Sequence, residues 1–396
     1  MSSRHRALLL ALLPIAPLLA APDRPPLDIQ IFATVPEPGQ PEGIAVAADG
    51  RVFVGTHTSA ASTSGPPSKL FEYDAGGQLL GAIAIAGQQL DATHGLTGMA
   101  FDGNGILFVL DRAPPRVLMI DPNTGAQAIY ATFHEVAPCG QGGTPGDCSA
   151  TVTDLAAFPD YLVFAPDGTL YVTDIQQALL WRVPPGGGEA EVWLTDARLE
   201  GAFGPNGIQF LPDGETLLFV QTGSQPPGTT DPGTGVLYTL PVLGDGSPGE
   251  LATFWAGQQP AEGPDGFALA ASGKVYVALA GTNQLMVLSP TGEELARVPA
   301  TPVENEMLPV PFDTPASVAF SGESVLVTNQ SYFAGNPDSW VVYDIFAGEP
   351  GLPLYQPLPE PGAAPGLFAG AALLAMLQTG KARKAGCASL SRPTPA

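Results

Sequence analysis

Six copies of one short phrase constrain the fold of this chain more than any other feature. Each copy has a small or polar residue before a glycine or its equivalent, an apolar run, a turn often ending in Asp-Gly, and a second apolar run. The copies read PEGIAVAADGRVFVG, LTGMAFDGNGILFVLD, PDYLVFAPDGTLYVTD, PNGIQFLPDGETLLFVQT, PDGFALAASGKVYVALA and PASVAFSGESVLVTNQ. Two such runs joined by a tight turn indicate a β-hairpin.

Each hairpin is followed by two more strand-like runs, such as NQLMVLSP and GEELARVPA after the fifth copy. Four strands per unit, repeated roughly every 50 residues, are typical of the blades of a β-propeller. We therefore predict an all-β fold, a six-bladed β-propeller. The sixth unit lacks a fourth strand, whereas the run LDIQIFATV from Leu27 has no local partner. We predict that this N-terminal strand closes the last blade and leaves the ring without exposed edges.

The ends of the chain differ from the repeats, and we divide the 396 residues into three parts. Residues 1–21 have a basic start, a short apolar run and small residues, which is the pattern of a secretory signal peptide. Residues 22–350 form the propeller. Residues 351–396 form a Pro-rich linker and a short apolar and basic tail, too short in its apolar run to span a bilayer. The tail either makes a weak membrane contact, packs on the propeller, or is flexible.

Composition and export restrict the partners. The net charge of −23 repels nucleic acid phosphates and attracts cations, so we exclude nucleic acid as a partner. A signal peptide predicts a periplasmic, cell-surface or secreted protein in an oxidising compartment. Cys139 and Cys148 bracket a glycine-rich loop, and we predict a disulfide between them. The alternative is two free thiols.

One position of the repeat carries polar side chains in most copies. Its occupants are Glu42, Thr97, Asp160, Asn206, Asp265 and Ala316. If this position opens the innermost strand of each blade, all six lie at one end of the central channel. Glu42, Asn206 and Asp265 then form an oxygen-only site, with Asp160 as a fourth member. Such a set suits one divalent cation, with Ca²⁺ preferred. The alternative is that these side chains cap turns.

Candidate catalytic groups are few. His94 precedes the second inner strand and is expected at the same end of the channel, where it could act as a base, although a surface-loop histidine is the simpler interpretation. No Gly-x-Ser-x-Gly elbow, His-Glu-x-x-His motif or phosphate loop is present. Nucleophilic serine catalysis is therefore not supported.

The phrases PEG, GPNGIQFLPDG and GPDGFALAASGKVYVA, and the ending DIFAGEPGLPL, resemble the family of regucalcin, gluconolactonase and luciferin-regenerating enzyme. The resemblance implies one divalent metal in the channel mouth, with Glu42, Asn206 and Asp265 as ligands and Asp265 as the base that activates water. The third copy departs from the family pattern. Relatives commonly have Asn-Asp after the proline, whereas this chain has Asp160 and Tyr161, which we take as the candidate substrate-binding residues.

Two functions follow from this resemblance. The first is an exported, metal-dependent hydrolase of a small-molecule lactone or related ester, in which water attacks a metal-polarised carbonyl. The second is a non-catalytic binding module of the NHL type, or a propeller of the strictosidine-synthase type, because the fold alone does not determine the activity.

Overall fold

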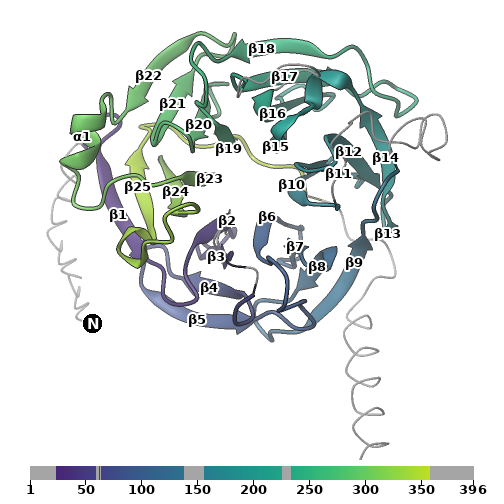
Figure 1. The fold of residues 1–396 in the computed structure, drawn as a ribbon, viewed down its shortest axis with the longest axis horizontal. Helices are drawn as coiled ribbons and strands as arrows, with labels where there is room; N and C mark the ends of the chain where they lie inside the picture. The colour runs from purple at the N-terminus through teal and green to yellow at the C-terminus, as the bar shows by residue number, and fades with distance from the viewer. Residues whose placement is uncertain (1–23, 59–61, 63, 138–155, 225–232, 357–396) are drawn as a thin grey trace, which may run out of the picture.

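The computed structural model describes residues 24–58, 62, 64–137, 156–224 and 233–356. These residues form six small, mainly antiparallel sheets around a central axis (Figure 1). The predicted six-bladed β-propeller is confirmed. The predicted signal peptide, both Cys139 and Cys148, and the tail beyond residue 356 lie outside the described residues.

Blades 1 to 3 follow one another along the chain. Blade 1 consists of β2 (Pro41–Val46), β3 (Val52–Thr56), β4 (Lys69–Tyr73) and β5 (Leu79–Ala84). Blade 2 consists of β6 (Leu96–Phe101), β7 (Leu107–Arg112), β8 (Pro115–Ile120) and β9 (Gln127–Thr132), with β13 (Gly188–Glu189) added in parallel to β9. Blade 3 consists of β10 (Pro159–Phe164), β11 (Leu170–Asp174), β12 (Leu179–Val183) and β14 (Glu191–Thr195).

Blades 4 to 6 complete the ring. Blade 4 consists of β15 (Gly201–Phe210), β16 (Thr216–Ser224), β17 (Val236–Pro241) and β18 (Ala252–Ala256). Blade 5 consists of β19 (Pro264–Leu269), β20 (Val275–Leu279), β21 (Gln284–Leu288) and β22 (Glu294–Val298). Blade 6 consists of β23 (Pro315–Ser321), β24 (Ser324–Asn329), β25 (Val341–Phe346) and β1 (Ile29–Thr34).

Helical turns contribute little to the described part of the chain. They are α1 (Pro302–Glu306) and the 3₁₀ turns η1 (Ala197–Leu199) and η2 (Pro337–Ser339). None of the helices among the described residues is long and apolar enough to cross a bilayer.

A turn with a glycine of positive φ sets the hairpin that begins each blade, and in blades 1, 3 and 4 it is an Asp-Gly turn. In blade 3 the Asp167 carboxylate accepts a hydrogen bond of 2.9 Å from the backbone N–H of Thr169. Gly168 between them has φ of 87°, a conformation that glycine adopts without steric cost. The turn therefore fixes how β10 and β11 pair, and with it which side chains of β10 face the channel.

The hydrophobic core is divided into six clusters, one between each pair of neighbouring blades. Between blades 2 and 3, the fully buried Trp181 shares a cluster with Phe108 and Phe164, whose ring centroids are 5.0 Å apart. Burying apolar surface contributes about 25 cal/mol per Å². Because each blade buries both faces against its neighbours, no blade is stable without the ring.

The last blade is closed by the first strand. Ile29 of β1 lies opposite Ile345 of β25, and Thr34 lies opposite Val341. Beyond the strand, the Val35 N–H donates to the Trp340 carbonyl at 2.8 Å. In Figure 1 the purple β1 lies beside the yellow-green β25, although the whole propeller separates them in sequence. The predicted closure is confirmed.

The chain does not leave the propeller at residue 350. The Ala271 N–H donates to the Pro350 carbonyl, and the Leu352 N–H donates to the Leu269 carbonyl, which attaches this segment to blade 5. Tyr355 then packs edge-on against Phe210 of blade 4, with ring centroids 5.9 Å apart. The first residues of the expected linker therefore form a strap across one end of the channel.

Closure by β1 predicts a large difference between two adjacent positions of that strand. Ala33→Asp places a carboxyl in the buried contact between blades 6 and 1 and should lower the free energy of unfolding by ~3 kcal/mol. Thr34→Asp, on the exposed face of the same strand, should change it by less than ~0.5 kcal/mol. Urea unfolding of both variants measures this, and equal stability of the two would contradict the closure.

Candidate functional site

The repeated position lies in a β-bulge of every inner strand, as the second residue of five strands and the sixth residue of β15. In each blade the pairing of the first two strands shifts register across that position and the next residue. The shifts fall between Pro41 and Ile44, Leu96 and Met99, Pro159 and Leu162, Pro205 and Ile208, Pro264 and Phe267, and Pro315 and Val318. A bulge re-aims the side chain that it carries. Here it directs these side chains toward the channel rather than into the blade interfaces.

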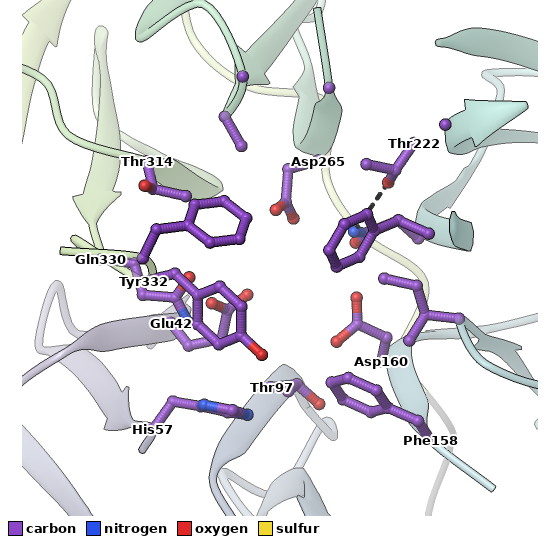
Figure 2. A pocket seen from close by; sticks show the side chains of 18 of the residues that line it. Glu42, His57, Thr97, Phe158, Asp160, Thr222, Asp265, Thr314, Gln330 and Tyr332 are labelled. Carbon is purple, nitrogen blue, oxygen red and sulfur yellow. Dashed lines mark hydrogen bonds between the residues drawn. The ribbon is translucent and has the colours of Figure 1, made fainter. Parts of the chain in front are cut away.

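Five of the six side chains at this position line one cavity of about 260 Å³ at the entry end of the inner strands. They are Glu42, Thr97, Asp160, Asn206 and Asp265. Figure 2 shows Glu42, Thr97, Asp160 and Asp265 approaching a common space from different directions. The structure therefore brings together the four residues that we predicted as metal ligands, from blades 1, 3, 4 and 5.

Two of the carboxyl groups are almost fully buried. Glu42 is 5% exposed and Asp160 is 4% exposed. Burial raises the pKa of Glu42 well above its usual value, and the charges of Asp265 and Asp160 raise it further. Burial and the charge of Asp265 likewise raise the pKa of Asp160, whereas the positive charge of Arg112 opposes both shifts. The cavity therefore disfavours three negative charges unless a cation accompanies them.

Asp265 and Asn206 form the opposite side of the cavity. Burial raises the pKa of Asp265 to about 7, and hydrogen bonds from Asn206 and from the Gly266 N–H oppose this rise. The Asn206 amide also donates to the Thr222 hydroxyl at 3.1 Å. These donated bonds orient the amide so that its Oδ1 is left to face another group.

The oxygen atoms of this pair fit a cation. Asn206 Oδ1 and Asp265 Oδ1 are both buried, and neither has a hydrogen-bond partner among the described residues. A buried polar atom without a partner is costly, so such atoms in a native site usually contact a ligand or ion. Carboxylate and amide oxygens are the donors that Ca²⁺ prefers. The donor set therefore suits a hard divalent cation.

The cavity is not a preformed carboxylate cluster. Among the described residues, no three His, Cys, Asp or Glu side chains lie close enough together to hold a metal ion by themselves. Mutual repulsion of the buried carboxyl groups favours this wider spacing. This finding includes Glu42, Asp160 and Asp265, so the three carboxyl groups of the predicted set do not by themselves form such a group in this structure.

Tyr161 does not line the carboxyl cavity. Its side chain crosses the channel from blade 3 to blade 6, where its hydroxyl hydrogen-bonds the Ser317 hydroxyl. It passes Gly266, where a Cβ would collide with the end of the tyrosine side chain. Tyr161 also lines a second cavity, of about 400 Å³, on the side covered by the C-terminal strap. As placed, it closes the floor of the site and does not present its ring to a ligand in the upper cavity.

His94 also lies away from the cavity. Its side chain is fully buried, with Nδ1 2.7 Å from the Ala92 carbonyl and Nε2 2.9 Å from the Pro66 carbonyl. Both ring nitrogens are therefore engaged by backbone, so His94 precedes β6 as expected but neither lines the cavity nor lies on the surface. The histidine that lines the cavity is His57, at the end of β3.

Several lining residues were not found from the sequence. Four of them follow the second strand of a blade: His57 in blade 1, and Gln330, Tyr332 and Phe333 in blade 6. Two more, Phe158 and Phe203, come shortly before the repeated polar positions Asp160 and Asn206. Because the first two strands of each blade are antiparallel, the end of the second strand lies at the same end of the channel as the start of the first. That topological signal was present in the sequence and could have identified them.

Residues 199–328 match the family described as the SMP-30/Gluconolactonase/LRE-like region. The predicted family resemblance is confirmed. The matched residues include two of the four polar residues assigned to a metal, Asn206 and Asp265. Among curated proteins, none is matched by this chain at a significant level.

Solved structures of this family share the fold. A luciferin-regenerating enzyme superposes with a TM-score of 0.54 at 12% identity, covering 84% of this chain and 99% of that one. Regucalcin from Agrobacterium tumefaciens, a calcium-binding protein, gives 0.52 at 18% identity, covering 83% and 98%. A gluconolactonase from Xanthomonas campestris gives 0.50 at 17% identity, covering 83% and 99%. At these identities the likenesses show the propeller fold alone.

His57 predicts a measurable pH dependence of stability. Its Nδ1 is 2.6 Å from the Thr58 carbonyl, and its Nε2 faces the Arg112 guanidinium at 3.5 Å. Burial and the Arg112 charge lower the pKa of His57 from 6.5 to about 3. The unfolded chain thus binds this proton at higher pH than the folded chain does. Burial of the neutral His57 ring therefore makes its full contribution to the free energy of unfolding above pH 6.5, and this contribution is lost as the pH falls toward 3.

His57→Asn should therefore flatten the acid limb of the stability profile. Between pH 6 and 4, the free energy of unfolding of the unmodified protein should fall more steeply than that of the variant, by up to ~1.4 kcal/mol per pH unit. Urea unfolding at several pH values measures the difference, with the part-exposed His134→Asn as the matched control. Parallel profiles for His57→Asn and the unmodified protein would contradict the assignment.

Proposed function

We propose that this chain is an exported, metal-dependent hydrolase that acts on a lactone or related ester. The observation that carries the proposal is the convergence of Glu42, Asp160, Asn206 and Asp265, from four blades, on one cavity. Two of their oxygens are buried without a hydrogen-bond partner among the described residues. The gluconolactonase-type family match over residues 199–328 supports a lactonase-type reaction.

Glu42, Asn206, Asp265 and Asp160 would hold one divalent cation, with Ca²⁺ favoured because every donor is a hard oxygen. A relative of the same fold is described as calcium-binding, which agrees with that choice. When bound, such a cation supplies polarisation of a carbonyl group. It also offsets the repulsion among three buried carboxyl groups.

The chain's own residues supply orientation and proton transfer. The Asn206 amide is held by Thr222, and the Glu42 carboxyl is held by a hydrogen bond from Gln330. Both groups are therefore fixed before a ligand enters, which lowers the cost of binding. We assign Asp265 as the base that takes a proton from water, because its free Oδ1 faces the same cavity. His94 takes no part in this proposal.

Export remains part of the proposal and rests on the N-terminal sequence pattern. A small-molecule lactone or ester is the expected partner. Turnover distinguishes this proposal from a binding module, which would take up the cation and a ligand without hydrolysis.

The cation site predicts one saturable Ca²⁺-binding event in chelator-stripped protein. Asn206→Ala and Asp265→Ala should each weaken Ca²⁺ by at least tenfold, because each removes a cavity oxygen that has no other partner. Isothermal titration calorimetry measures this, with Asn104→Ala in an exposed turn as the control. If the unmodified protein does not bind Ca²⁺, the four polar side chains cap turns and do not form a cation site.

The assignment of the base predicts a separation of metal binding from rate. Asp265→Asn keeps an oxygen donor but loses the carboxylate, so Ca²⁺ should still bind while the rate of lactone hydrolysis falls by ~10²- to 10⁴-fold. Calorimetry and a pH-indicator assay on the same preparation measure both quantities. Full activity of Asp265→Asn with the cation bound would show that another group is the base.

A further inference from the structure

The walls of the carboxyl cavity are aromatic, unlike its floor. Phe158, Phe203, Tyr332 and Phe333 line it above the carboxyl groups, together with Ile175. Figure 2 shows Phe158 and Tyr332 on the rim of the space that Asp160 and Glu42 enter. The cavity therefore joins a charged floor to an apolar wall.

The wall is a continuous series of ring contacts, which we call the aromatic collar (Phe158, His57, Tyr332, Phe333 and Phe203). His57 stacks on Phe158 with centroids 6.3 Å apart and meets Tyr332 edge-on at 5.8 Å. Tyr332 meets Phe333 at 5.2 Å. Phe333 meets Phe203 at 6.5 Å. The collar thus connects blades 3, 1, 6 and 4 around the mouth, and no single blade accounts for it.

Two members of the collar are exposed without a structural reason. Phe203 is 39% exposed and Phe333 is 63% exposed, whereas most phenylalanines of the described residues are buried between blades. Large exposed apolar side chains that cluster at a cavity usually contact a ligand. By contrast, Phe158 is held from outside by the Arg112 guanidinium, which lies 3.8 Å from its ring centroid. The collar therefore has a fixed side and an open side.

The wall offers few partners for hydroxyl groups. Three of the neighbouring polar side chains are already engaged, since Thr97 donates to the Pro159 carbonyl, Thr222 accepts from Asn206, and Gln330 bonds Glu42. The hydroxyl-bearing Thr314 and Tyr332 also line the cavity. A polyhydroxylated ligand would lose its hydrogen bonds to water against the collar and regain few of them. An apolar substituent would gain free energy at the same place.

We propose that the preferred substrate is a lactone whose ring carries a short alkyl or aryl group, rather than a sugar lactone. This inference rests on the proposed hydrolase function. The ring carbonyl lies at the carboxyl floor, and the apolar group lies between Phe203 and Phe333. Water adds to the carbonyl and the bond from the acyl carbon to the ring oxygen breaks. The ring oxygen leaves as a hydroxyl, and the products are a hydroxy carboxylate and one proton. A cavity of about 260 Å³ limits the substrate to one ring and a short chain.

The test is a chain-length series of δ-lactones, unsubstituted and with methyl, propyl and pentyl groups beside the ring oxygen, compared with glucono-δ-lactone. In the unmodified protein, kcat/KM should rise by about two- to fourfold per added methylene until the cavity is full. It should be lowest for glucono-δ-lactone. A preference for glucono-δ-lactone, or no rise along the series, would overturn the proposed substrate class while leaving the hydrolase function intact.

The Phe203→Ser, Phe333→Ser double variant should reduce the rise to less than twofold per methylene. Phe333→Leu, which keeps an apolar side chain, should retain most of the rise in kcat/KM with chain length. Leu295→Ser, at an exposed position on the outer strand β22, is the matched control and should change nothing. An unaltered rise in the double variant would show that the collar does not contact the substituent.

Failure of the hydrolase function is detected separately with δ-lactams bearing the same alkyl groups, which cannot be turned over in this way. Their affinity by calorimetry should increase with chain length and lose that increase in the double variant. If no lactone is hydrolysed but the lactams behave so, the hydrolase proposal fails and the ligand class stands. If the lactams do not bind, or bind without regard to chain length, the ligand class fails.

Discussion

The pairing of β1 with β25 is the contact on which the rest of this structure depends. Ile29 lies opposite Ile345 there, and every blade buries both of its faces only because the ring is complete. The candidate site has no scaffold of its own, since its four candidate ligands come from four blades and its rings from four. An opened ring would leave Glu42 and Asp265 in separate sheets with nothing to fix their distance. Ring closure therefore determines both the stability of the fold and the geometry of the site.

Within the closed ring, the β-bulge of each inner strand turns the side chain at the repeated position into the channel, and this creates the candidate site. Without it, side chains at the second position of β2, β10 and β19 would alternate regularly with their neighbours along the strand. With it, three carboxyl groups enter the channel, and the raised pKa values of Glu42, Asp160 and Asp265 express the cost of their burial. Hydrogen bonds from Gln330 and Asn206 offset part of the cost. A site that is expensive to form and leaves oxygens unpaired is arranged for binding rather than for stability.

Periodicity explains how far the sequence could be interpreted. Repeated hairpins predict blades, the missing fourth strand predicts closure by β1, and a fixed position in the repeat predicts that Asp265 and Asn206 meet. The repeat does not predict where side chains outside the repeated phrase lie. His94 precedes an inner strand but turns to backbone carbonyls, whereas His57 follows β3 and reaches the cavity. Tyr161 stands where four other blades have glycine, and its length carries it across the channel to Ser317, which holds the same position in blade 6. Which way a long side chain turns depends on space left by other blades, and the sequence does not display that space.

The two ends of the channel are not equivalent, and this asymmetry bears on selectivity. Tyr161 forms the floor beneath the carboxyl groups, and the strap ending at Tyr355 covers the far end. The aromatic collar lies at the opposite, uncovered end of the cavity. The floor is built from the repeated strands, whereas Tyr332 and Phe333 belong to a loop outside the repeat. Loops change without disturbing the blades that hold the floor. In such a design the repeat determines the chemistry, and the collar determines which molecules reach it.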